Sequence, residues 1–357
     1  MNTTAILRAS KHLKTNLEGG LILSDYTRQI ITIINYNIIG ALINLCGTVA
    51  NILNIATFIR QGFADSMTVS LMGLALSDLG CLITLQWLNL CFNPLFRYAP
   101  GLPFESFELE YLTAGWPHVC FARVTGLITA YITMERCLCI AMPLKVKMLI
   151  TPKRTSIVIT AIFILVFCSA APVFTVILAD WKFYPERNKT LLGVVFAPNR
   201  AEVETVAFAF NNLYGYIAMI SVTIFTIILV INLKSNSKWR QGTSTASSSE
   251  SKNEATTRDK RVVKMVVTIS TMFVVCFFPI TAVVVGTMVE PGFGKGGRYR
   301  NIYHSICSLC YAMETVNAAA NFPIYMKMSS RFRVAFNTLW CKPCGGDVDS
   351  GMKKSGE

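Results

Sequence analysis

Charged residues are scarce in this 357-residue chain, since only 15% of its residues are Asp, Glu, Lys or Arg. Soluble domains carry about 25% charged residues, and here 53% of the chain is hydrophobic. Such a composition excludes an ordinary soluble domain and an intrinsically disordered chain. Cysteine is also sparse, with 12 residues that mostly lie inside apolar runs, which argues against a disulfide-rich secreted module. The composition therefore indicates a protein with several membrane spans.

Stretches that lack charged residues divide the chain into seven candidate membrane-spanning helices. A bilayer core of about 30 Å needs roughly 20 apolar residues in a helix, and each stretch is at least that long. Three stretches contain one charged residue each, namely Asp78, Arg123 and Glu314. The seven stretches are residues 30–59, 66–96, 111–134, 155–179, 205–233, 265–289 and 301–326. We therefore expect an all-α membrane protein, a seven-helix transmembrane bundle.

The distribution of Lys and Arg among the connecting segments predicts the topology. If residues 1–29 lie outside the cell, the inner segments hold 20 Lys/Arg and 8 Asp/Glu, and the outer segments hold 12 and 10. An excess of basic residues marks the cytoplasmic side. We expect an extracellular tail 1–29, a receptor domain 30–326 and a cytoplasmic tail 327–357, at the plasma membrane and in contact with its lipids. This topology accounts for the net charge of +13 without nucleic acid as a partner.

Sites of covalent modification agree with this topology. N-glycosylation sequons begin at Asn2 and Asn188, and both fall on predicted outer segments. Apolar residues recur at helical spacing near the C-terminus and predict a short amphipathic surface helix over 328–340. Cys341 and Cys344 follow that helix, where either palmitoylation or a free thiol would fit.

Charged side chains inside the predicted spans need a partner or a function, because a charge at the bilayer centre costs at least about 2.5–3.5 kcal/mol. His118 and Arg136 are five helical turns apart and share one face of the third span, whereas Arg123 lies on its flank. His118 is therefore either a pocket residue or a hydrogen-bonded packing residue. Arg123 meets either a neighbouring helix, with Asn211 and Asn212 as candidate partners, or an anionic ligand.

Five short motifs follow one another in a fixed order between residues 45 and 340. They are G-T-V-A-N at 47–51, L-A-L-S-D at 74–78, E-R-C at 135–137, F-V-V-C-F-F-P at 273–279 and N-F-P-I-Y at 321–325. Together with the topology, they resemble the motifs of the rhodopsin-like (class A) G-protein-coupled receptors. Residues 115–126 and 135–140 further resemble the chemosensory receptors of gastropod molluscs and invertebrate peptide receptors, which indicates a divergent invertebrate branch.

The resemblance implies roles for residues at the inner end of the bundle. Arg136 would engage a heterotrimeric G protein in the active state, and Glu135 would hold it in the inactive state. Asp259 would be a second acidic partner for that arginine. Asn321 and Tyr325 would belong to the switch at the inner end of the seventh span.

The resemblance also implies an allosteric sodium ion, and no other cofactor. Its ligands would be Asp78, Thr125, Asn317 and Asn321. Such an oxygen-rich set with one carboxylate suits a hard cation. Without sodium, the same residues would form a plain polar network.

Candidate ligand-binding residues lie nearer the outer face: His118, Arg123, Glu314 and Phe277, which resembles the family's toggle aromatic residue. His118 and Arg123 favour a ligand with an anionic or acceptor group. Glu314 favours a cationic group, or it neutralises Arg123 across the bundle. The sequence leaves these alternatives open.

The chain departs from the family where a disulfide usually ties the third span to the second outer loop. Tyr111 occupies the expected third-span position, and no cysteine lies between Cys168 and Cys276. The usual tie is therefore absent. A replacement disulfide between Cys91 and Cys307 is one further hypothesis.

We expect a receptor that binds an extracellular ligand and activates a G protein, with arrestin and a receptor kinase as further partners. A chemosensory small molecule is the favoured ligand, and an FMRFamide-like amidated neuropeptide is the alternative. An enzyme is disfavoured, because the chain has three histidines and neither an H-E-x-x-H nor a G-x-S-x-G motif. A small polytopic transporter is the alternative function from another class of protein, but no internal repeat in the sequence supports it.

Overall fold

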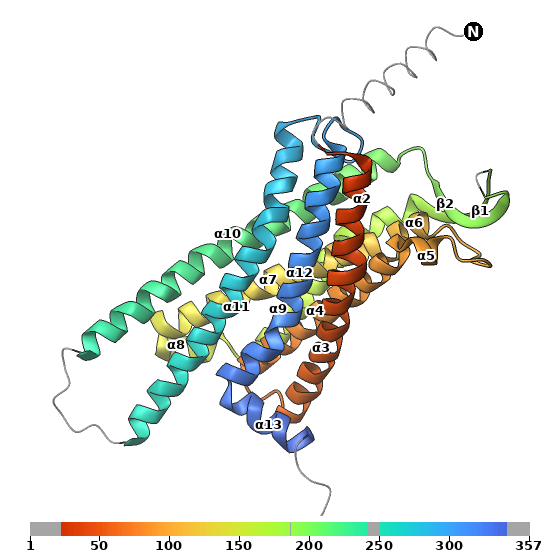
Figure 1. The fold of residues 1–357 in the computed structure, drawn as a ribbon. Helices are drawn as coiled ribbons and strands as arrows, with labels where there is room; N and C mark the ends of the chain where they lie inside the picture. The colour runs from red at the N-terminus through yellow and green to blue at the C-terminus, as the bar shows by residue number, and fades with distance from the viewer. Residues whose placement is uncertain (1–22, 186, 242–249, 341–357) are drawn as a thin grey trace, which may run out of the picture.

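A bundle of seven long helical segments forms the computed structural model, which describes residues 23–185, 187–241 and 250–340 (Figure 1). The segments are α2 (Asp25–Ile33) continued by the π-helical turn η1 (Ile34–Gly40) and α3 (Ala41–Gln61); α4 (Ser66–Phe92); α6 (Ser106–Glu110) continued by the π-helical turn η2 (Tyr111–Gly115) and α7 (Trp116–Ala141); α9 (Pro152–Ala170); α10 (Arg200–Gln241); α11 (Glu250–Val289); and α12 (Arg300–Met328). Short helices lie between or after them: α5 (Pro94–Arg97), α8 (Pro143–Leu149) and α13 (Ser330–Trp340). The predicted all-α bundle is confirmed.

Among the described residues, six segments are long and apolar enough to cross a membrane, and α12 is not one of them. α12 has 29 residues, which is more than the 27 of α4, but many of its buried residues are polar. They include Asn301, Ser308, Glu314, Thr315, Asn317 and Asn321. Because α12 packs against α3, α4 and α11, protein rather than lipid covers these side chains. α12 is therefore the seventh helix of the bundle, and its hydropathy is low because its polar face points inward.

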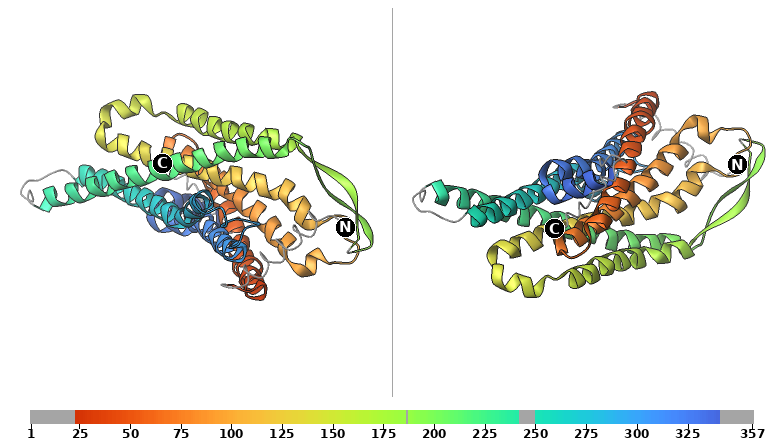
Figure 2. Two further views of the ribbon diagram at one scale, coloured as in Figure 1. Left: turned by 90° about the horizontal axis from the view of Figure 1, so that it is seen from above. Right: turned by 90° about the horizontal axis from the view of Figure 1, so that it is seen from below.

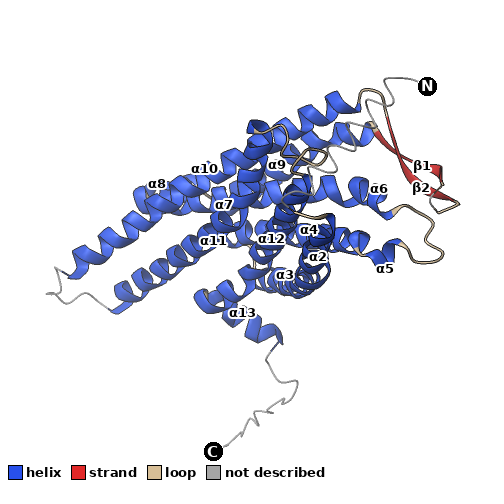
Figure 3. Cartoon of the chain, turned by 45° about the horizontal axis from the view of Figure 1, so that its top comes forward, coloured by secondary structure: helices blue, strands red, loops and turns tan. Residues whose placement is uncertain are grey.

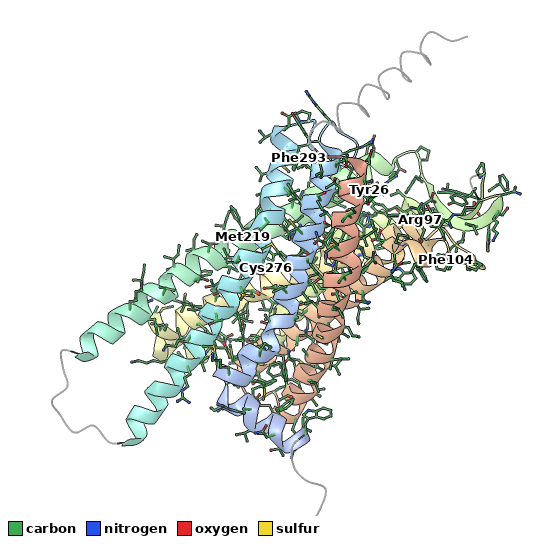
Figure 4. All side chains as sticks on the ribbon, in the orientation of Figure 1. Tyr26, Arg97, Phe104, Met219, Cys276 and Phe293 are labelled. Carbon is green, nitrogen blue, oxygen red and sulfur yellow. The ribbon has the colours of Figure 1, made fainter. Side chains whose placement is uncertain are left out.

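α7 lies at the centre of the bundle and packs against α4, α9, α10 and α11. Its apolar residues Val124 and Ile128 are fully buried in the main hydrophobic core. A second cluster lies halfway along the bundle, where Met219 of α10 packs near Cys276 of α11 (Figure 4). Large apolar side chains such as Ile227 stay exposed on the outside, as expected for helices that face lipid.

A β-hairpin covers one end of the bundle and projects beyond the helices (Figures 2 and 3). β1 (Ile177–Tyr184) and β2 (Lys189–Phe196) are antiparallel, with Ile177 opposite Phe196. The sequence placed the end of the fourth span at residue 179, which is wrong. The helix ends at Ala170 because Pro172 cannot continue its backbone hydrogen bonds, and the 3-10 turn η3 (Ala171–Thr175) leads into β1.

Candidate functional site

A cavity of about 970 Å³ opens at the hairpin end of the bundle. Its volume lies at the upper end of the range for small-molecule sites. Residues of α2, α4, α7, α10, α11 and α12 line it, so that most helices of the bundle contribute. The charged lining residues are Arg28, Arg97, Glu110, Arg123, Lys295 and Glu314. Among these six described lining residues, four are cations and two are carboxylates.

A buried histidine–carboxylate pair forms one wall of the cavity. Nε2 of His118 lies 2.9 Å from Oε2 of Glu314, and both side chains are more than nine-tenths buried. On its other side, the His118 ring approaches the Thr84 hydroxyl at 3.5 Å and packs edge-on against Tyr311. Two of the predicted ligand-binding residues therefore contact each other and join α7 to α12.

Arg123 lines the same cavity but faces α10. It forms no hydrogen bond or ion pair with any residue that the structure describes, and its buried Nε has no partner there. Asn212 lines the cavity beside it, whereas the Asn211 amide donates to the Ala207 carbonyl of its own helix. Glu314 exerts an electrostatic pull on Arg123, but its carboxylate is bonded to His118.

Phe277 is placed differently from the other three predicted ligand-binding residues. It is not among the described residues that line the cavity. Its ring stacks on Phe273 with centroids 4.6 Å apart, inside the second hydrophobic cluster. Contact between Phe277 and a bound molecule would require a rearrangement of that cluster.

Ion pairs tie the hairpin to the bundle where the usual disulfide is absent. Glu105, next to the start of α6, pairs with Arg187 of the hairpin turn at 2.8 Å and with Arg97 of α5 at 3.1 Å. Glu108 accepts hydrogen bonds from the Lys182 ammonium and from the Val194 backbone N–H. The hypothesis of a replacement disulfide is wrong, because Cys91 and Cys307 are both free.

Tyr111, which stands in place of the missing third-span cysteine, takes part in a similar contact. Its hydroxyl donates to Glu204 at the start of α10 over 2.8 Å. Glu204 also pairs with Arg200, whose guanidinium lies 3.5 Å from the ring centre of Phe196 in β2. The hairpin is therefore connected to α6, η2 and α10 without a covalent bond.

Asp78 lies at the centre of a buried polar cluster between α4, α7 and α12. Its Oδ1 accepts from the Thr125 hydroxyl over 3.0 Å, and its Oδ2 accepts from the Asn321 amide over 2.6 Å. The Thr125 hydroxyl also lies 2.9 Å from that of Ser77. Asn317 is buried on α12 but forms no hydrogen bond with the other three predicted sodium ligands in the part of the chain that the structure describes. The candidate ligands offer oxygen atoms, and the carboxylate of Asp78 is fully buried without a cationic partner among the described residues. This chemistry fits a hard cation.

Arg136 lies at the opposite end of α7 from the cavity. Its Nη2 is 2.6 Å from Oε1 of Glu135, a fully buried carboxylate. The hydroxyls of Ser66 and Ser70 donate to the same carboxylate over 2.5 and 3.4 Å. Two serines of α4 therefore fix the carboxylate of Glu135, which in turn pairs with Arg136.

Tyr325 lies near this end of the bundle, where it joins α12 to α13. Its ring is fully buried and packs against Phe58 of α3 and Phe332 of α13, with centroids 5.4 Å apart in both cases. Its hydroxyl has no partner among the described residues. Asp259 lies on α11, but its side chain is outside the described residues, as are Asn2, Cys341 and Cys344.

Asn188 occupies the turn of the hairpin and is exposed. Its φ of 48° is in the left-handed region, which asparagine tolerates better than most residues. The exposed position leaves its side chain accessible.

Sequence reasoning missed several residues of the cavity wall, among them Trp116, Tyr311 and Lys295. Trp116 and Tyr311 lie inside apolar stretches, where nothing in the composition separates a cavity wall from the core. Lys295 lies between α11 and α12 and approaches the Tyr111 ring at 5.7 Å. Its glycine-rich surroundings predict a loop and not its position over a cavity.

Seven helices, with a cavity that contains charged lining residues at one end and an arginine paired with a buried glutamate at the other, define a membrane receptor of the seven-helix class. The family described as serpentine type 7TM GPCR chemoreceptor Srw matches residues 35–343. The chain belongs to this family of G-protein-coupled receptors and is a multi-pass protein of the plasma membrane. The resemblance seen in the sequence motifs is therefore confirmed.

Curated receptors from vertebrates and insects are also similar to the chain. Growth hormone secretagogue receptor type 1 of Sus scrofa is 25% identical over 227 residues, which cover 61% of this chain and 58% of that receptor. The receptor of the same name from Homo sapiens is 24% identical over 227 residues, with the same coverage. The allatostatin-A receptor of Bombyx mori is 22% identical over 347 residues, 96% of this chain and 88% of that receptor. The chain thus spans somewhat over half the length of the secretagogue receptors that it matches.

Proposed function

We propose that the protein binds a small extracellular chemosensory molecule in the cavity and activates a heterotrimeric G protein through the opposite end of the bundle. The observation that carries this proposal is the position of the cavity and the Arg136–Glu135 pair on one continuous helix. His118 and Arg136 are separated by about 27 Å along α7. The family description, which names chemoreceptors, supports the choice of ligand class.

Activation follows from a difference in affinity between two arrangements of the helices. A ligand that binds the active arrangement more tightly increases its population. In the resting arrangement Ser66 and Ser70 hold Glu135, and Glu135 holds Arg136. Loss of these contacts frees the guanidinium to bind the G protein. Asp259 is a further acidic partner in this proposal.

The proposed orientation places the N-terminus and the hairpin outside the cell. The excess of Lys and Arg in the segments on the α13 side supports it. A glycan on Asn188 would then have room, because this residue is exposed at the hairpin turn. Glycosylation of Asn2, palmitoylation of Cys341 and Cys344, and binding of arrestin and a receptor kinase belong to the same proposal.

Sodium binding at Asp78 is part of the proposed mechanism. Asp78, Thr125 and Asn321 would hold the ion, and Asn317 would join them through a rotation of its side chain. The ion would stabilise the resting arrangement because its ligands come from α4, α7 and α12 together.

A second candidate ligand is a neuropeptide, such as an FMRFamide-like amidated peptide. The similarity of the allatostatin-A receptor over 96% of this chain favours it. Both ligand classes would use the same cavity and the same G-protein-binding end. A direct comparison of the two ligand classes is therefore the decisive experiment.

The receptor is expressed in cells that carry a promiscuous G protein, and calcium is measured with a panel of water-borne metabolites and a panel of amidated peptides. A response to metabolites supports chemosensation, and a response to peptides moves the function to neuropeptide signalling. The Arg136→Ala receptor should lose either response at equal surface expression. Arg331→Ala, which changes an exposed arginine near the same end, should signal normally. Normal signalling by Arg136→Ala would contradict the proposed role.

A further inference from the structure

The cations that line the cavity differ in how their charge is compensated. Arg97 pairs with Glu105 at 3.1 Å, and Arg28 approaches Asp25 at 3.6 Å. Lys295 is exposed and therefore hydrated. Arg123 alone of the four described lining cations is neither exposed nor paired.

A small second cavity adjoins the large one at Arg123. Its volume of about 10 Å³ holds a single water-sized group. Arg123, Asn212, Ile280 and Val284 line both cavities, so the small one is a side pocket of the large one. Tyr216 also lines it, and its buried hydroxyl has no partner in the described residues.

α10 makes room for the guanidinium with a glycine. A Cβ added to Gly215 would lie 2.8 Å from Nη1 of Arg123 and 3.1 Å from its Cζ. Any other residue at this position would displace the arginine head group. The side chain is therefore held between α7 and α10 at a site where its donors face the side pocket.

The chemistry of the side pocket is that of an anion receptor. A guanidinium presents several N–H donors in a planar fork, which fits the two oxygens of a carboxylate. The Tyr216 hydroxyl adds a further donor. Glu314 does not take this place, because His118 already binds its carboxylate at 2.9 Å. A guanidinium at this depth without a hydrogen-bonded acceptor among the described residues is costly, and an incoming anion would supply that acceptor.

The geometry points to a carboxylate subsite on Arg123: the ligand of this receptor carries a carboxylate that pairs with the guanidinium where the large cavity meets the side pocket, with one oxygen in the side pocket between α7, α10 and α11. This inference rests on the proposed function, since it names the chemical class of the molecule that the cavity binds. Its apolar part would lie in the larger cavity against residues such as Phe208 and Ile280. Arg123 thus selects acids over the corresponding amides.

The test measures thermal melting of the purified receptor with benzoate and with benzamide, at equal concentration and ionic strength. Benzoate should raise the melting temperature of the wild type, and benzamide should not. Arg123→Met should lose the response to benzoate and, without added anion, should melt above the wild type because a buried unpaired charge has been removed. Arg298→Met, the same change at an exposed cation that does not line the cavity, should respond like the wild type.

Gly215→Ala tests the subsite if Arg123→Met does not fold, because it keeps the arginine and crowds its head group. It should raise the benzoate concentration needed for a half-maximal shift at least tenfold. Equal effects of benzoate and benzamide on the wild type, or an undiminished benzoate response in both variants, would overturn the proposal. A result in which Arg123→Met melts below the wild type and still responds to benzoate would assign Arg123 a packing role instead.

The outcome for the subsite is separable from that for the receptor function. The melting experiment contains no G protein, so Arg136→Ala should respond to benzoate like the wild type. Benzoate binding without any G-protein signal from the receptor would refute the proposed function and leave the subsite. Signalling by ligands that lack an acidic group, with no effect of Arg123→Met, would refute the subsite and leave the function.

Discussion

Replacing Glu105 with alanine should loosen the hairpin, because this carboxylate joins two arginines at the end of the bundle. It accepts from Nε of Arg97 at 3.1 Å and pairs with Nη2 of Arg187 at 2.8 Å. Of the two contacts, only the one with Arg187 reaches the hairpin, because Arg97 lies on α5. A hydrogen bond to a charged group contributes about 1.5–3 kcal/mol, and the Arg187 side chain is 17% exposed, so water recovers part of this in the variant. We expect a net loss of about 1–2 kcal/mol in the free energy of hairpin opening.

Hydrogen exchange of the backbone amides in residues 177–196 measures this opening. Because 1.4 kcal/mol corresponds to a factor of ten, exchange should accelerate by about 5- to 30-fold where opening limits it. Asp180→Ala is the matched control, since this exposed carboxylate on β1 accepts only from the neighbouring Trp181 amide among the described contacts. An unchanged rate in Glu105→Ala, or an equal increase in Asp180→Ala, would refute the idea that the Glu105 contacts hold the hairpin in place of a disulfide.

Two further predictions concern the other end and the middle of the bundle. Phe332→Ala should destabilise the receptor by about 3–5 kcal/mol, because the ring is 1% exposed and packs on Phe58. The measurement is thermal melting, with Val334→Ala at an exposed position on the same helix as the control. Equal melting temperatures of the two variants would contradict the prediction. Sodium, compared with N-methylglucamine at constant ionic strength, should stabilise the wild type by about 1.4 kcal/mol per tenfold excess over its Kd. Asp78→Asn should abolish this effect and Asp65→Asn should retain it; a full sodium response in Asp78→Asn would exclude the proposed site.

The helical bundle was predictable because lipid imposes a simple rule on composition. A span must be about 20 residues long and nearly free of charge, and this rule located all seven helices of the bundle. It did not locate every end, because α10 continues beyond 233 to Gln241 and α11 begins at Glu250 and not at 265. It failed at residue 179, because the apolar run continues through Pro172 into the first strand of the hairpin. An apolar run of β-branched and aromatic residues is compatible with both a helix and a strand.

The contacts between helices were less predictable, because they depend on the rotation of each helix about its axis. The wheel of the third span correctly separates His118 from Arg123, which the structure places toward α12 and α10 respectively. Spacing along the sequence does not tell whether Glu314 pairs with a ligand, with Arg123 or with His118. The answer requires the position of α12 relative to α7, which only the folded bundle provides.

The hairpin contacts were unpredictable for a different reason. Glu105 and Glu108 lie in the short segment 97–110, whose sequence shows three acidic residues near the membrane surface and no sign of their partners. Their partners Arg187 and Lys182 come from a loop 74 or more residues away, and charge alone pairs any basic residue with any acidic one. The sequence does show, through Tyr111 and the absence of cysteine from 169 to 275, that the usual covalent tie is missing. That absence required another connection without indicating which residues would form it.

Three buried carboxylates of the bundle share one geometrical feature, which is that each takes part in a contact between α7 and a neighbouring helix. Glu314 of α12 binds His118, Asp78 of α4 binds Thr125, and Glu135 of α7 itself is held by hydroxyls of α4. A displacement of α12 against α7 would stretch the first contact, and it would also disturb the second through Asn321, which binds the same carboxylate as Thr125. Because these contacts are short and buried, they cannot be lost one at a time without leaving an unpaired polar group. The cavity wall and the polar cluster below it are therefore mechanically connected through α7, whose last turns carry Arg136.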